Sequence, residues 1–153
     1  MIKLEIINNI KSSKINNNDL FEVISNIDTK YSKLDNKFNY EIAILITDNK
    51  EIKHYNNKYR SKNKETNILS FPNIDEMDRE INPIIGDIII SEEKIAYEAI
   101  EQNKTFNSHL KHIFLHGVLH LFGYDHENEH DAQIMESIEV EILKKININN
   151  PYI

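Results

Sequence analysis

The chain has 153 residues, a formal net charge of −7 and no cysteine. This length fits one domain with a single hydrophobic core, and the lack of cysteine excludes disulfides and thiolate metal ligands, as suits a reducing compartment. The acidic total disfavours a general nucleic-acid binder, because affinity for phosphates comes largely from clustered Lys and Arg.

No targeting or membrane segment is evident in the sequence. Residues 1–9 carry charges inside their apolar run and lack a small-residue cleavage site, which argues against a signal peptide. No apolar run approaches the roughly 20 residues that a membrane-spanning helix needs. We therefore expect one domain over residues 1–153, located in the cytoplasm, with no membrane partner.

The first third of the chain predicts a strand, a helix and a second strand. Residues 2–7 are rich in Ile and Leu and are typical of a strand. Residues 18–34 place apolar side chains at alternating steps of four and three, which predicts one helix that opens at Asn18 or Asp19. Residues 38–47 alternate and predict a strand that is buried on both faces toward its end.

The middle third predicts a helix, two more strands and a loop. Asp48 is a suitable N-cap for a short helix. Residues 67–71 predict a third strand, which Pro72 ends, and residues 73–82 are acidic and without pattern, which predicts an exposed loop. A fourth strand follows over residues 84–90, where the Gly86-Asp87 pair indicates a bulge or a close backbone approach.

The last third predicts three helices. Ser91 caps the first, which runs to about residue 102, and Asn107 or Ser108 caps the second. The second helix has an apolar side (Leu110, Phe114, Val118, Leu121) and, within roughly 80° of arc on another side, four histidines (His109, His112, His116, His120). The third, from about Asp131, turns four isoleucines inward (Ile134, Ile138, Ile142, Ile146), and the tail after it is expected to fray.

This order of elements predicts the fold class. It indicates a single α+β domain in which a four-stranded mixed sheet is flanked by about five helices. No internal repeat is present in the sequence.

Histidines are concentrated in one stretch. Between His112 and His130 lie five of the seven histidines and two of the three glycines of the chain. His116 and His120 are four residues apart and share a helix face, Gly123 can end the helix and turn the chain, and His126 follows. This H-x-x-x-H-x-x-G-x-x-H order has the ligand spacing of the metzincin zinc site, so we expect these three histidines to bind one metal ion.

One position departs from the metalloprotease pattern. The general-base Glu of H-E-x-x-H would stand at residue 117, where this chain has Gly117. A closed, purely structural zinc site is an alternative, with Asp125 or His130 as the fourth ligand, and a run of core histidines is another. We favour a catalytic site with an open fourth position.

A basic segment precedes the third strand. Six basic and two acidic residues between Lys50 and Glu65 give it a local charge of +4, and Arg60 is one of only two arginines in the chain. Taken by itself, this charge is explained better by an ordinary solvated helix and loop than by a binding surface.

Three segments together resemble the YbeY family of bacterial metal-dependent endoribonucleases, which are ribosomal RNA maturation factors. They are Tyr59-Arg60 with Lys62 and residues 66–72 (Thr-Asn-Ile-Leu-Ser-Phe-Pro), residues 86–91 (Gly-Asp-Ile-Ile-Ile-Ser), and the stretch from His112 to His126, followed by Met135 and Glu139. The third is the most specific of the three. The first 45 residues carry little of the likeness, and Asn63 stands where the family commonly has Asp.

This resemblance implies a function and roles for residues. It implies one zinc ion bound by His116, His120 and His126, with Arg60 as a functional residue of the cleft. It also implies single-strand-specific cleavage of RNA, in maturation of the small-subunit ribosomal RNA 3′ end and in ribosome quality control. The partners would be ribosomal RNA and the small subunit or its assembly factors, with no DNA expected.

Two other functions remain open at this point. The ligand spacing alone also fits a metalloprotease-like hydrolase, which the missing Glu disfavours. The acidic total charge also fits a non-catalytic zinc-containing adaptor that acts in ribosome assembly through contacts.

Overall fold

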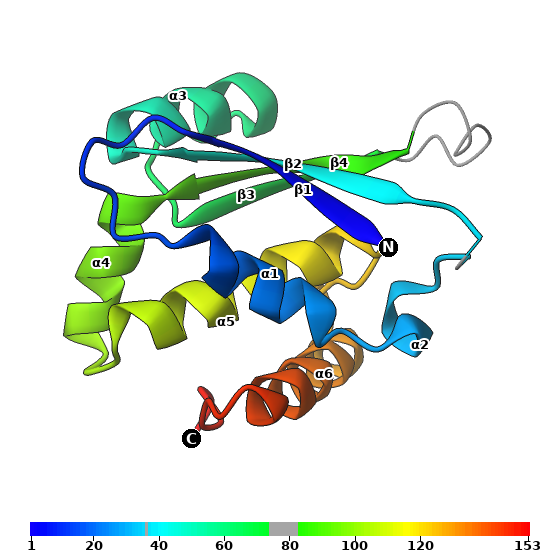
Figure 1. Cartoon of the computed structure of the whole chain (residues 1–153). Coiled ribbons are helices and arrows are strands. Elements are labelled where there is room, and N and C mark those ends of the chain that lie inside the picture. Colours follow the sequence, from blue (N-terminus) through cyan, green and yellow to red (C-terminus); the bar gives the residue numbers. More distant parts are fainter. Residues whose placement is uncertain (36, 74–82) are drawn as a thin grey trace.

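The computed structural model describes residues 1–35, 37–73 and 83–153 (Figure 1). Its sheet contains four strands: β1 (Ile2–Asn8), β2 (Tyr40–Thr47), β3 (Ile68–Pro72) and β4 (Ile84–Ser91). Their order is β1-β2-β4-β3, with β1 and β4 both parallel to β2 and β3 antiparallel to β4. The prediction of a four-stranded mixed sheet in an α+β domain is confirmed. The loop expected at residues 74–82 lies outside the described ranges.

Six helices accompany the sheet in the described part of the chain, where about five were expected. They are α1 (Asn17–Ser25), α2 (Thr29–Ser32), α3 (Asn49–Arg60), α4 (Glu92–Glu101), α5 (Phe106–Leu121) and α6 (Glu129–Lys145). None of the helices within these ranges is long and apolar enough to cross a membrane.

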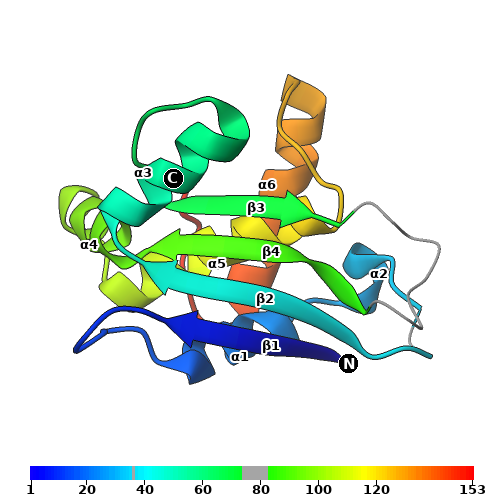
Figure 2. The ribbon, with the colours of Figure 1, turned by 90° about the horizontal axis from the view of Figure 1, so that it is seen from above.

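The helices lie unequally on the two faces of the sheet. Helices α1, α5 and α6 lie on one side, and α3 lies on the other, beside β3 (Figures 1 and 2). The main core fills the first side, with fully buried residues from the sheet (Ile42, Ile46, Ile90) and from α5 (Leu110, Phe114, Leu115, Val118, Leu119). A small second cluster of Ile52, Leu69 and Ile89 fixes α3 on the opposite face. On the side of the main core, helix α5 packs against β3, which is the edge strand of the sheet.

The prediction of one continuous helix over residues 18–34 was wrong. The structure has two helices there, and Asn26 ends the first while Asp28 caps the second by accepting a hydrogen bond from the Lys30 amide. Short polar side chains compete with the helical backbone hydrogen bonds, which explains the break. Asn16, two residues earlier than predicted, is the N-cap of α1.

Both features predicted at Gly86 are present. The pairing of β2 with β4 slips there, because Glu41 faces Ile84 while the next residue, Ile42, faces Gly86. A Cβ atom at Gly86 would lie 2.6 Å from the Phe71 carbonyl oxygen and 2.7 Å from Cδ2 of Leu121. Only glycine therefore lets β3 and α5 approach β4 this closely.

The ends of the last helices differ from the predictions. Thr105, not Asn107 or Ser108, caps α5, and Asn128 caps α6, which begins at Glu129. On α6, Ile134 is 40% exposed and its neighbour Met135 occupies the core instead. The segment after α6, which was expected to fray, is held by Tyr152, whose hydroxyl donates to Glu139.

Candidate metal centre and the adjoining cleft

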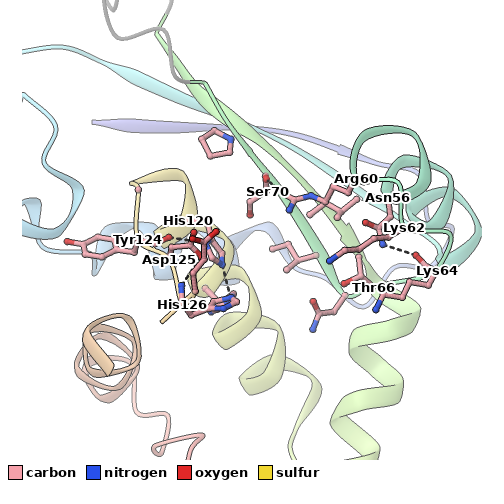
Figure 3. Close-up of a pocket in the computed structure, with 17 residues that line it drawn as sticks. Asn56, Arg60, Lys62, Lys64, Thr66, Ser70, His120, Tyr124, Asp125 and His126 are labelled. Atoms are coloured by element: carbon pink, nitrogen blue, oxygen red, sulfur yellow. Dashed lines mark hydrogen bonds between the residues drawn. The ribbon is translucent and has the colours of Figure 1, made fainter. Parts of the chain in front are cut away.

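Three histidines converge where α5 ends. His116 and His120 occupy the last two turns of α5, Gly123 adopts a φ of +97° that turns the chain, and His126 follows the turn. One nitrogen from each of the three rings lies within 4.8 Å of the other two. Figure 3 shows His120 and His126 side by side at one end of a cleft. The structure thus brings together the three residues that the spacing singled out.

Hydrogen bonds fix which nitrogen of each helical histidine faces the centre. The Nδ1 of His120 lies 2.9 Å from the Tyr124 carbonyl oxygen, and the Nδ1 of His116 lies 3.2 Å from Oε1 of Glu139. Carbonyl and carboxylate oxygens only accept, so both Nδ1 atoms carry the proton. The two Nε2 atoms, 3.1 Å apart, then turn lone pairs toward each other.

This donor set fits a zinc ion. Zinc–nitrogen bonds of about 2.0–2.1 Å in a tetrahedral site place ligand nitrogens about 3.3 Å apart, close to the separation of the two Nε2 atoms. Burial, followed by the nearby His116, lowers the pKa of His120, which keeps this imidazole neutral and able to coordinate. The lone pairs of the two Nε2 atoms face each other with no proton between them, and a cation bound there would remove their mutual repulsion.

The centre opens into a cleft of about 790 Å³. One wall comes from the end of α5 and the turn after it, and carries the three histidines with Tyr124 and Asp125. The other comes from the end of α3, the following loop and β3, and carries the basic side chains Arg60, Lys62 and Lys64 (Figure 3). Three of the six basic residues of the segment from Lys50 to Glu65 thus line the same cleft as the histidines.

Arg60 is held in place on this second wall. Its Nη2 donates to the Ser70 carbonyl oxygen at 2.6 Å, and its guanidinium lies 5.4 Å from the centre of the Phe71 ring. The Ser70 hydroxyl in turn donates to the Gly117 carbonyl oxygen at 3.0 Å. Since a guanidinium has five N–H donors, the others stay available for an anionic group, and Arg60 is linked through β3 to the helix of the histidines.

The loop between α3 and β3 is anchored as well. Asn56, which is buried in α3, donates from Nδ2 to the Lys64 carbonyl oxygen at 2.9 Å. At the start of β3 the Asn67 side chain donates to Glu98 of α4 at 3.0 Å. These bonds hold Lys62 and Lys64 at the rim of the cleft.

The position of the protease base is occupied by the sheet. A Cβ atom at Gly117 would lie 2.5 Å from Cδ1 of Ile68 and 3.0 Å from Oγ of Ser70, so Gly117 leaves no empty space for a larger side chain. Glycine is needed for close packing of α5 on β3. A Glu at this position fits only if the side chains of Ile68 and Ser70 move.

Two histidines of the predicted arc do not reach the cleft. His109 is 2% exposed, and its Nε2 lies 3.0 Å from Glu98 of α4. His112 lies 3.1 Å from Glu139 of α6. The positions of the four histidines around the helix axis do not distinguish these two from the candidate ligands, because the difference depends on which neighbouring helix covers each turn of α5.

Two further residues near the turn have structural contacts. The Asp125 carboxylate accepts from the His126 amide at 2.7 Å, a contact within the turn itself. The Tyr124 hydroxyl donates to the Tyr31 carbonyl oxygen, and Lys33 covers its ring. These contacts tie Tyr124 to the segment around α2 and give it a packing role.

The sequence analysis assigned no role to Glu139. It is a fully buried carboxylate between His112 and His116. Burial alone would raise its pKa, but hydrogen bonds from both histidines outweigh that effect and lower the pKa to about 2. A charged residue among the core positions of α6 was the signal that could have identified it.

Comparison with known proteins identifies the family. The family model described as endoribonuclease YbeY matches residues 5–147. The chain belongs to the YbeY family. Proteins named endoribonuclease YbeY include one from Ruthia magnifica subsp. Calyptogena magnifica, 43% identical over 95% of this chain and 97% of that protein. One from Bartonella bacilliformis is 47% identical over 73% of this chain and 72% of that protein.

A solved structure has the same fold as this YbeY family chain. It is the solution structure of a protein from Thermotoga maritima, with a TM-score of 0.60. The alignment covers 96% of this chain and 92% of that one, at 22% identity. The likeness supports the arrangement of strands and helices alone.

Proposed function

We propose that this chain is a zinc-dependent endoribonuclease that cuts single-stranded RNA. The observation that carries the proposal is the arrangement of the cleft. Three imidazoles whose nitrogens lie close enough to bind one ion stand on one wall, and Arg60, held by a hydrogen bond, stands on the other beside two lysines. Membership of a family whose members are named endoribonucleases supports the reaction class.

The proposed metal ligands are His116, His120 and His126, with one ion. Three neutral imidazoles leave the +2 charge of the ion undiluted, so bound zinc would supply a Lewis acid that activates water and polarises a phosphoryl oxygen near neutral pH. Their donor nitrogens are already gathered on one side of the cleft.

Arg60 is the proposed catalytic residue of the protein itself. Its free N–H donors can take two oxygens of a phosphodiester and stabilise the negative charge that develops on them. The bond to the Ser70 carbonyl oxygen keeps the guanidinium oriented before substrate arrives, so little side-chain entropy is lost on binding.

The cleft favours RNA over peptide as substrate. Lys62 and Lys64 offer point charges for consecutive phosphates along the rim, and the room for a protease Glu at residue 117 is taken by Ile68 and Ser70. We also propose, from the family resemblance, that the RNA is ribosomal and that the chain acts in the cytoplasm in small-subunit 3′-end maturation and ribosome quality control. Assembly factors of that subunit are the proposed protein partners.

The substrate class can be tested with three matched probes. They are a labelled single-stranded RNA, the same strand in a perfect duplex, and a labelled unstructured peptide, each incubated with the zinc-loaded protein. We expect cleavage of the single strand only. Cleavage of the peptide would establish the protease alternative, and no cleavage of any probe by fully loaded protein would favour the non-catalytic adaptor.

A further inference from the structure

A buried carboxylate lies directly behind the metal centre, outside the cleft. Glu139 of α6 has no exposed surface and is surrounded on its helix by the core residues Met135, Ile138 and Ile142. Its Oε1 lies 3.2 Å from Nδ1 of His116 and 3.1 Å from Nε2 of His112. Its Oε2 accepts from the Tyr152 hydroxyl at 2.9 Å.

Stability of the fold gives no reason for a charge at this place. Removing a carboxylate from water is costly, and replacing a buried ion pair by well-packed apolar residues is often neutral or stabilising. The neighbouring positions of α6 are apolar and already form the core contact with α5. The carboxylate therefore calls for a role that an apolar side chain does not fill.

We propose that Glu139 is the positioning residue for His116. By accepting from Nδ1–H it fixes the ring orientation and the tautomer, so that the Nε2 lone pair of His116 is directed to the point shared with His120. The Tyr124 carbonyl does the same for His120. A charged acceptor additionally makes the imidazole a more basic metal ligand than a carbonyl does.

His112 and Tyr152 complete the support. Nε2 of His112 donates to the carboxylate oxygen that His116 also uses, and Tyr152, from the segment after α6, occupies the other oxygen. The ring of Tyr152 packs edge-on against His112 at 5.5 Å between centroids. With three donors around it, Glu139 has one orientation, and this geometry gives His112 and Tyr152 the task of holding the positioning residue.

This inference rests on the proposed metal site but not on RNA cleavage, and zinc affinity tests it directly. We would measure zinc binding by chelator competition for wild type, Glu139→Gln and Glu139→Ala. The matched control is Glu98→Gln, because Glu98 forms the same carboxylate–histidine pair with His109 of α5, at 3.0 Å, without touching a proposed ligand. Far-UV circular dichroism of the metal-free proteins checks that each variant is folded.

We expect Glu139→Ala to weaken zinc binding by about 10- to 100-fold, the usual effect of losing such a partner. Glu139→Gln, which keeps an acceptor oxygen but loses the charge, should fall between Glu139→Ala and wild type, and Glu98→Gln should stay within about 2-fold of wild type. Unchanged zinc affinity in Glu139→Ala, or an equal loss in Glu98→Gln, would overturn the assignment.

A second readout uses the wild-type protein alone. Long-range proton–nitrogen NMR spectra of the metal-free protein report which ring nitrogen of His116 carries the proton. The proposal requires Nδ1–H, and Nε2–H would refute it even if no Glu139 variant folds. A wild type that binds zinc and has this tautomer but cuts no RNA would refute the proposed function and leave the role of Glu139 standing. A wild type that binds no zinc would refute both.

Discussion

Individual residues set how closely the layers of this protein approach one another. Gly86 and Gly117 both stand where a side chain would meet β3, but the atoms that they would meet differ in kind. At Gly86 the nearest atom is the Phe71 carbonyl oxygen, whereas at Gly117 it is the terminal methyl of Ile68. A backbone atom cannot rotate away, and a terminal methyl can.

This difference predicts unequal costs of the same substitution. Gly86→Ala should lower the free energy of unfolding by about 1–3 kcal/mol, the usual range for overpacking, and Gly117→Ala should lower it by less. Urea denaturation of the metal-free proteins measures both. An equal or larger loss in Gly117→Ala would show that the approach of α5 to β3, not that of β3 to β4, is the tighter one.

Single residues also show what the sequence could and could not reveal. The approach of two candidate metal ligands was predictable because the helical period alone puts His116 and His120 on one face. The role of Glu139 was not predictable. A charged side chain among the core-facing positions of α6 has no evident partner until the fold places the histidines of α5 beside it. The break at Asn26 was missed since the apolar stripe continues across it.

At the scale of elements, the histidine helix is held by carboxylates from both of its neighbours. Glu98 of α4 bonds His109 near the start of α5, and Glu139 of α6 bonds His112 and His116 further along. Each pair links α5 to another helix on the same side of the sheet. Both links join α5 to its neighbours, but only the Glu139 link reaches a proposed metal ligand, His116.

The link at Glu98 predicts a pH dependence of stability. Burial raises the pKa of its carboxyl group, but hydrogen bonds from His109 and Asn67 outweigh burial and lower it below the ordinary 4.5. A folded-state pKa below the unfolded one means stabilisation that is present above about pH 4.5 and lost as the pH falls through the folded value. Glu98→Gln, which cannot titrate there, removes this contribution.

The measurement is urea denaturation of metal-free wild type and Glu98→Gln between pH 3 and pH 6. The difference in the free energy of unfolding between the two proteins should be largest at the upper end and shrink toward pH 3. A difference that is constant across the range would show that the charge of Glu98 contributes nothing.

At the scale of the whole molecule, the local charge of the cleft wall is opposite in sign to the net charge of the chain. The chain has a net charge of −7, yet Arg60, Lys62 and Lys64 line one wall of the cleft that the proposed metal faces. Attraction to RNA must therefore be local and depend on a few phosphate contacts. The composition indicated the total correctly, but only the fold brings the basic loop opposite the histidines, which lie more than 50 residues away in the sequence.

If few phosphates are contacted, the affinity for RNA should depend only weakly on salt concentration, and Lys62 and Lys64 should account for part of that dependence. For a single strand, each phosphate contact contributes about 0.7 to the slope of log affinity against log salt. The double variant Lys62→Ala with Lys64→Ala should reduce the slope by about 1.4. The control is Lys144→Ala with Lys145→Ala in the last turn of α6, outside the cleft. Equal slopes in the two double variants would place the RNA elsewhere.

The central claim is that metal and arginine act together on RNA in one cleft. Its most direct test is to measure zinc content and single-strand RNA cleavage on the same preparations of wild type, His116→Ala and Arg60→Glu. We predict about one zinc and cleavage for wild type, loss of both for His116→Ala, and loss of cleavage with zinc retained for Arg60→Glu. Equal cleavage by all three proteins would contradict the claim and assign the activity to a contaminant.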